Sequence, residues 1–157
     1  MKLKKTAFSS AAVFVLITIM VLAGFNTSAA EEAPKVVKVT FDDVTPYDAP
    51  GHFKMSANSF IGGRAGNAEN LQIGLSIFEP GGGAEQSTRP VEMIYFVLEG
   101  TLTITTPDGE ITLNQHDAIY RPVGSMAGII NNSGAPVKML VIAPVAAAPA
   151  GAPPAHK

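Results

Sequence analysis

The sequence predicts an all-β sandwich or barrel, and three observations support this. The central part, residues 35–144, is a succession of short runs rich in β-branched and aromatic residues, most of which alternate with polar ones. Gly-, Pro-, Asn- and Asp-rich segments separate the runs, and no helical apolar stripe follows residue 30. Since short strands at regular spacing are typical of all-β folds and no internal repeat is present, we expect one barrel.

Nine runs are expected to form strands, each bounded by residues that favour turns. In chain order they are residues 35–41, 58–63, 71–80, 92–100, 101–106, 110–113, 117–122, 126–132 and 137–144. The segment TPDGE, residues 106–110, predicts a tight hairpin because Asp-Gly suits a two-residue turn. The glycine-rich segments 62–67 and 80–83 lack the Lys-Ser/Thr of a phosphate loop, so both are interpreted as turns.

The two ends are expected to lie outside this domain. Residues 1–30 combine the basic start MKLKK with an uncharged apolar run over 11–25 and small residues at the end. This pattern predicts a secretory signal peptide cleaved after Ala30, with an uncleaved anchor helix as the alternative. The mature chain is then secreted or periplasmic. Residues 145–157, rich in Ala and Pro, are predicted to be a disordered tail, which leaves residues 35–144 as the domain.

Composition excludes several classes of function. The chain has 11 Lys and Arg against 13 Asp and Glu. Removal of the signal and its three lysines leaves 8 basic residues and a net charge of −5, so we expect no nucleic-acid partner. We expect no membrane association after signal cleavage. The sequence has no cysteine, which excludes thiol nucleophiles, thiolate metal sites and disulfides.

The order of the segments resembles the cupin family. The resemblance covers about residues 71–143, and its most specific parts are YFVLEG at 95–100, followed by a Thr-rich strand, and DAIYRPVG at 117–124. It implies a single cupin-type, RmlC-like jelly-roll β-barrel. Because this scaffold is widely reused, the resemblance transfers the fold more firmly than any function.

The metal-ligand positions of the family's two motifs are changed in this chain. Counting back from Gly100, the two His positions and the Glu position hold Ser87, Arg89 and Met93, and the His position of the second motif holds Ala127. A divalent first-row ion needs imidazole and carboxylate donors, whereas arginine is a permanent cation. The three histidines are widely separated in the sequence. We therefore expect no metal and no other cofactor.

The segment that carries Ser87, Arg89 and Met93 is instead expected to line a pocket without a metal. If Arg89 and Met93 face inward as the family's ligands do, strand alternation gives a mainly apolar lining with a few polar groups, which is how small-molecule sites are usually built. The predicted ligand-binding residues are Arg89, Ser87, Met93, Tyr95, Gln72, Ser76, Ala127, Ile129 and Asn131.

Arg89 allows three interpretations. A buried guanidinium requires an anionic partner, and that partner is either the carboxylate or phosphate of a ligand or an internal carboxylate from Glu85 or Glu92. A third possibility is that Arg89 turns to solvent. Arg121 is interpreted as pointing outward, with a role in the pocket as the alternative.

Two residues are weak candidates for catalysis. Tyr95 offers a phenol as a general acid, although strand tyrosines more often pack their ring and bond their hydroxyl locally. His52 is a candidate base at the barrel mouth, although a histidine at a surface or strand edge is more common. Whether the chain is an enzyme therefore stays open at this point.

Three functional hypotheses follow. The first is an exported, metal-independent module that binds a small anionic or aromatic organic molecule in the pocket. The second is a metal-independent isomerase, epimerase or lyase that uses acid–base catalysis. The third is a structural or interaction domain of the cell envelope. The resemblance also implies a homodimer, with residues 35–41 as an exchanged or edge strand.

Overall fold

The computed structural model describes residues 35–145. The predicted signal peptide and tail lie outside the described residues, apart from Val145, and stay predictions. Within the described segment, no helix is long and apolar enough to cross a membrane.

The described segment folds almost entirely into β-strands. The eight strands are β1 (His52–Ile61), β2 (Leu71–Ser87), β3 (Met93–Glu99), β4 (Leu102–Thr106), β5 (Gly109–Leu113), β6 (Ala118–Arg121), β7 (Ala127–Ile130) and β8 (Val137–Pro144). Two short 3-10 turns, η1 (Phe41–Asp43) and η2 (Gly63–Ala65), precede β1 and β2 respectively. The predicted all-β class is confirmed, and the hairpin predicted at TPDGE joins β4 to β5, with Thr106 paired to Gly109.

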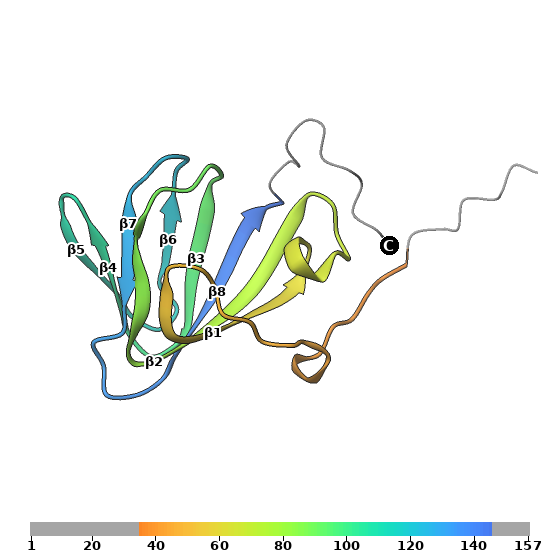
Figure 1. Ribbon diagram of the computed structural model, residues 1–157, viewed down its shortest axis with the longest axis horizontal. Coiled ribbons are helices and arrows are strands. Elements are labelled where there is room, and N and C mark those ends of the chain that lie inside the picture. Colours follow the sequence, from red (N-terminus) through yellow and green to blue (C-terminus); the bar gives the residue numbers. More distant parts are fainter. Residues whose placement is uncertain (1–34, 146–157) are drawn as a thin grey trace, which may run out of the picture. The chain divides into compact units, whose positions relative to one another are not determined.

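The strands form one antiparallel sheet that curls into a nearly closed jelly-roll barrel (Figure 1). The order along the sheet is β5-β4-β7-β2-β8-β3-β6, and β1 pairs with β2 outside this path. β2 is the longest strand, and it pairs with β8 along its first half and with β7 near its end. The inner side chains of these strands make the core; the buried cluster is Phe78, Tyr95, Val97, Leu102, Ile104, Leu113, Ala127, Ile129, Val137 and Met139.

The glycine run at 81–83 is not the turn that the sequence predicted, because it lies inside β2. A Cβ on Gly82 would overlap the carbonyl oxygen of Lys54, and one on Gly83 would overlap that of Ile129. Glycine is needed here because backbone from β1 and β7 approaches β2 very closely. The other glycine-rich segment, residues 62–67, does form the predicted turn around η2.

The strand expected over residues 35–41 does not form. Residues 35–40 are irregular, and Phe41 begins the turn η1. Asp43 Oδ2 accepts hydrogen bonds from the backbone nitrogen of Thr40, at 2.8 Å, and from its hydroxyl, at 2.6 Å. These bonds lower the pKa of Asp43 and cap the turn. These local bonds hold Thr40 and Asp43 in a turn at the end of the segment that was predicted as a strand.

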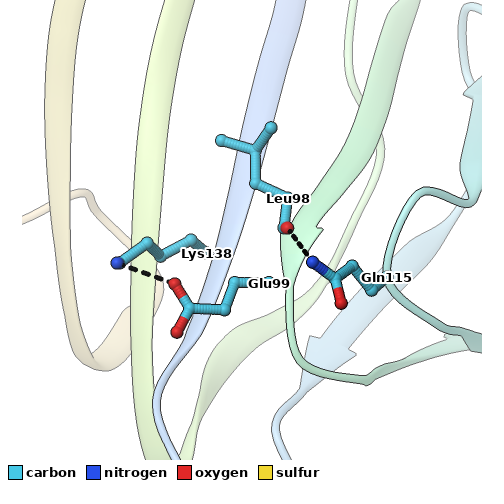
Figure 2. A network of polar contacts seen from close by, with 4 residues as sticks. All are labelled: Leu98, Glu99, Gln115 and Lys138. Carbon is cyan, nitrogen blue, oxygen red and sulfur yellow. Dashed lines mark hydrogen bonds and ion pairs between the residues drawn. The ribbon is translucent and has the colours of Figure 1, made fainter.

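Polar contacts hold the end of β3 to its neighbours (Figure 2). Glu99 pairs with Lys138 of β8 at 2.7 Å, and the Gln115 side chain donates a 3.0 Å hydrogen bond to the carbonyl of Leu98. The ion pair is solvent-exposed, so it contributes little to stability. These contacts lie at the strand end that runs into Gly100, where φ is +87° and glycine is favoured.

Candidate functional site

The barrel holds a cavity of about 360 Å³. Strands β1, β2, β3, β7 and β8 form its wall, and the segment before β1, including Tyr47 and Pro50, contributes to its rim. The lining combines apolar residues with amide and hydroxyl residues and with Arg64 and Arg89. No Asp or Glu of the described segment lines it. The cavity thus combines an apolar body with positive charge, in a chain whose net charge is −2.

Most of the predicted site residues meet at this cavity. Its lining includes the predicted ligand-binding residues Gln72, Ser76, Arg89, Met93, Tyr95 and Ile129, and also His52. Ser76 and Gln72 both come from β2, and Gln72 donates its side-chain amide to the carbonyl of Pro144 at 3.1 Å.

The structure does not bring Ser87, Ala127 and Asn131 to the cavity lining. Ser87 ends β2, and its strand partner Ala127 is packed in the core. The parity argument assumed one strand running from Ser87 through Met93, but the chain leaves the sheet between them. Alternation predicts a common face only within a single strand.

Asn131 has a structural position instead. Its side chain is fully buried, and its amide nitrogen lies within hydrogen-bond distance of the carbonyls of Phe78, Glu79 and Ala135. Its Oδ1 accepts hydrogen bonds from the backbone and hydroxyl of Ser133. Asn131 therefore ties the loop after β7 to the middle of β2.

Arg89 lies in the loop between β2 and β3 and reaches the cavity from there. Its backbone carbonyl accepts a 2.9 Å hydrogen bond from Gly124, which fixes the loop. Its Nε atom is buried without a hydrogen-bond partner, and no carboxylate of the described residues forms an ion pair with it. Glu92, one of the two internal partners considered, instead accepts a 2.8 Å hydrogen bond from Tyr120.

Arg121 does not point outward as expected, because it is 5% exposed. Its Nη1 donates a 2.8 Å hydrogen bond to the hydroxyl of Tyr95, and its Nη2 donates to the carbonyls of Ser87 and Ser125, at 2.8 and 3.0 Å. Met93 and Arg121 are cross-strand partners, so the two side chains share the inner face of the β3–β6 pair. Alternation with the exposed Tyr120 was the sequence signal that could have placed Arg121 inside.

Tyr95 links this buried arginine to the cavity. Its side chain is buried, and its hydroxyl accepts the bond from Arg121 while lying 3.7 Å from the sulfur of Met93. The guanidinium carbon of Arg121 lies 5.6 Å from the centroid of the Tyr95 ring. The sequence suggested Tyr95 as a proton donor but did not predict its hydrogen bond with Arg121.

His52 opens β1 and lines the cavity. Its Nδ1 lies 2.9 Å from the carbonyl oxygen of Pro50. A carbonyl only accepts, so Nδ1 is the donor, and in the neutral ring Nε2 is left as an acceptor. In its neutral form His52 would therefore present Nε2 as an acceptor, and its hydrogen bond to Pro50 fixes the orientation of the ring.

The donors at this site do not fit a divalent metal. The four motif positions hold Ser87, Arg89, Met93 and Ala127, and no cluster of three or more His, Cys, Asp or Glu occurs among residues 35–145. Arg89 would set a permanent positive charge beside any ion held in the cavity. The residues at these positions therefore do not suit the coordination of a divalent metal ion.

Comparison with known proteins identifies the family. The chain is 34% identical over 95 residues to the protein named Beta-D-galactosidase Rv1717 of Mycobacterium tuberculosis, which covers 60% of this chain and 82% of that protein. Residues 74–143 match the family model described as Cupin domain. This chain belongs to the cupin superfamily. The resemblance predicted from the sequence is confirmed.

Solved structures agree on the fold. The polyketide cyclase RemF of Streptomyces resistomycificus superposes with a TM-score of 0.63 at 23% identity, covering 71% of this chain and 80% of that one. A sugar phosphate isomerase of Silicibacter pomeroyi superposes with a TM-score of 0.57 at 22% identity, covering 69% of this chain and 75% of that one. At these identities the cupin likeness concerns the fold alone.

Proposed function

We propose that this cupin is an exported, metal-independent protein that binds a small organic anion in its barrel cavity. The observation that supports the proposal most directly is Arg89, which lines the cavity, has a buried Nε without a hydrogen-bond partner and forms no ion pair with a carboxylate of the described residues. A partly buried guanidinium is costly without an anion, and a ligand carboxylate or phosphate would supply one through two parallel hydrogen bonds.

The rest of the cavity supports the same class of ligand. Its volume of about 360 Å³ is within the range of small-molecule sites. Apolar lining from residues such as Phe78, Ile129 and Met139 suits an aromatic or aliphatic body. Because no Asp or Glu of the described segment lines the cavity, an anion meets no like charge there.

A binding experiment tests this proposal. Purified mature chain is titrated calorimetrically with a panel of small aromatic and aliphatic carboxylates and their neutral amides. We expect acids to bind and amides to bind at least tenfold more weakly, because an ionic hydrogen bond contributes roughly 1.5–3 kcal/mol. Arg89→Gln should remove the preference for the acids, whereas Lys138→Gln, which changes a surface charge paired with Glu99, should keep it. An acid-binding site unaffected by Arg89→Gln would overturn the assignment.

Export is the second part of the proposal and rests on the pattern of residues 1–30. N-terminal sequencing of the protein recovered from the native host is expected to begin at Glu31. A chain that keeps Met1 and stays with the cytoplasmic fraction would contradict it.

Acid–base catalysis on the bound anion is a second candidate function. Tyr95 and His52 line the same cavity, one with a phenol supported by Arg121 and the other with a free Nε2 acceptor in its neutral form. A proton donor and a proton acceptor around one ligand are what an isomerase, epimerase or lyase requires. Loss of turnover in both Tyr95→Phe and His52→Ala, with binding of simple carboxylates at Arg89 retained, is the expected result for any substrate found.

The name of the Mycobacterium tuberculosis relative suggests glycoside hydrolysis, and the cavity argues against it here. Most glycosidases use two carboxylates on either side of the scissile bond, and no Asp or Glu of the described segment lines this cavity. We expect no hydrolysis of p-nitrophenyl β-D-galactoside above the buffer rate. Turnover above that rate would contradict this expectation.

A cavity that binds none of these molecules would favour the third hypothesis, an interaction domain of the envelope. The calorimetric panel therefore separates the binding and structural interpretations directly, since a structural domain needs no occupied cavity.

A further inference from the structure

We propose that Arg121 is a positioning residue that directs the phenol hydrogen of Tyr95 into the cavity, so that the preferred ligand is an oxo acid. The inference rests on the proposed binding of an anion at Arg89 and adds a second requirement. Beside its carboxylate, the ligand offers a carbonyl or enol oxygen that accepts a hydrogen bond from Tyr95.

The first step of the argument is the direction of the bond between Arg121 and Tyr95. A guanidinium can only donate, so the phenol oxygen is the acceptor of the 2.8 Å bond from Nη1. The phenol hydrogen must then point elsewhere. Its acceptor among the described residues is the thioether sulfur of Met93, at 3.7 Å.

The second step is the weakness of that acceptor. A thioether sulfur is a poor hydrogen-bond acceptor, and both Met93 and Tyr95 line the cavity. A ligand oxygen near Met93 would therefore replace a weak bond with a strong one. Since Tyr95 is 4% exposed, bulk water competes little for this hydrogen.

The third step is the fixed orientation of the guanidinium. Nη2 of Arg121 is held by two backbone carbonyls, one at the end of β2 and the other in the loop between β6 and β7. These two bonds set the plane of the group and aim Nη1 at Tyr95. Arg121 has no carboxylate partner among the described residues and its Nε is unpartnered, so its charge is left to polarise the phenol.

The test uses matched pairs of acids that differ by one carbonyl oxygen. Phenylpyruvate is compared with 3-phenylpropionate, and 3-benzoylpropionate with 4-phenylbutyrate, by calorimetry on the mature chain. We expect at least one oxo acid to bind about fivefold or more tightly than its partner, the size expected for one neutral hydrogen bond. Tyr95→Phe should abolish this ratio while the affinity for the partner acid stays within about twofold.

Arg121 is tested through the same ratio. Arg121→Met should reduce the preference for the oxo acid. Arg121→Lys keeps the charge but lacks the planar set of guanidinium donors, so it should restore the preference in part. A purely structural arginine would weaken all four acids alike and leave the ratio unchanged. Tyr120→Phe removes an exposed phenol outside the cavity lining and serves as the matched control.

The outcomes are separable. If all four acids bind and each pair binds equally, or if the ratio survives in Tyr95→Phe, the inference is overturned while the proposed function stands. If none of the acids binds and the wider carboxylate panel also fails, the proposed function is overturned and the inference falls with it. Where Arg121→Met does not fold, as judged by circular dichroism, the Tyr95→Phe ratio still decides.

Discussion

The side-chain amide of Asn131 donates a 3.0 Å hydrogen bond to the backbone carbonyl of Phe78, at the point where the loop after β7 meets β2. The same side chain is fully buried and also contacts the carbonyls of Glu79 and Ala135. Asn131 therefore holds together segments that are distant in the sequence.

Asn131→Ala is expected to lower the free energy of unfolding by about 3 kcal/mol, because the carbonyl of Phe78 loses its donor in a buried bond and the carbonyls of Glu79 and Ala135 lose theirs in part-buried ones, at roughly 1–3 kcal/mol for a fully buried group. Urea unfolding followed by circular dichroism measures the change. Asn132→Ala, next in sequence but exposed, should change it by under about 0.5 kcal/mol. Equal effects of the two substitutions would show that the hydrogen bonds of Asn131 do not matter.

Gly83→Ala tests the close approach of β7 to β2. A Cβ at residue 83 would overlap the carbonyl of Ile129, so one of the two strands must move, at a cost of about 2 kcal/mol or more. Gly134→Ala is the control, because nothing lies within 4 Å of a Cβ there. The thermal midpoint should fall for Gly83→Ala and stay within about 2 °C for Gly134→Ala; a stable Gly83→Ala protein would mean that the strands separate easily.

The hydrogen bond from Tyr120 to Glu92 predicts a stability difference that depends on pH. The bond raises the pKa of Tyr120, because the carboxylate of Glu92 holds the phenol proton. The protonated phenol is thus favoured in the folded state. The resulting stabilisation is present below the unfolded pKa of tyrosine, about 10, and is lost as the pH rises through the higher folded value.

Thermal midpoints of the wild type and Tyr120→Phe, measured from pH 7 to 11.5, check this prediction. The wild type should be the more stable at pH 7–9, and its advantage should shrink at the alkaline end. In a Glu92→Ala background the advantage should disappear throughout. A stability advantage that is constant across the whole pH range would show that ionisation of Tyr120 is not coupled to folding.

Metal content is predicted to be near zero in the mature chain purified without a chelator or a His-tag. Elemental mass spectrometry measures it, and addition of EDTA should leave the thermal midpoint unchanged. The physical reason is the set Ser87, Arg89, Met93 and Ala127 at the ligand positions. Stoichiometric iron, manganese, zinc or nickel would refute this prediction and return metal-dependent chemistry to consideration.

A homodimer is predicted at micromolar concentration and is measured by sedimentation velocity. Ile94 and Tyr120 are cross-strand partners that stay 42% and 57% exposed beside the short edge strand β6, so this face suits association. Ile94→Asp is expected to shift the protein toward monomer. Ile111→Asp, equally exposed on β5 at the other end of the sheet, should not. A wild-type protein that sediments as a monomer would contradict the prediction.

The all-β fold could be predicted because turn residues and apolar alternation mark most of the strands locally in the sequence. The hairpin at TPDGE and the alternation around Tyr95 depend on neighbouring residues alone, and both are confirmed. The strand predicted at residues 35–41 was wrong: residues 35–40 are irregular and Phe41 begins η1, since alternation alone does not supply a strand to pair with. The glycines of β2 were mistaken for a turn because their reason lies in strands distant in the sequence.

The site was harder to predict than the fold. Arg89 was assigned to the cavity by a family position, and it does line the cavity, although it sits in a loop rather than on the expected strand. The buried position of Arg121 was not predicted, because its partners Tyr95, Ser87 and Ser125 come from three separate segments. Sequence alternation gives the face on which a residue lies, but it does not give the atom that the residue meets.

The strand order β5-β4-β7-β2-β8-β3-β6 has a consequence for the time the chain takes to fold. Of the pairings among the described strands, β1–β2 and β4–β5 join neighbours in the sequence, and the others join distant segments. Each distant pairing must close a large loop, which costs chain entropy before the stabilising contacts form. Folds dominated by such pairings fold in milliseconds to seconds. The β4–β5 hairpin can form early, but the cavity wall is complete only after β1, β2, β3, β7 and β8 have paired, so the proposed binding site depends on the slow, long-range pairings.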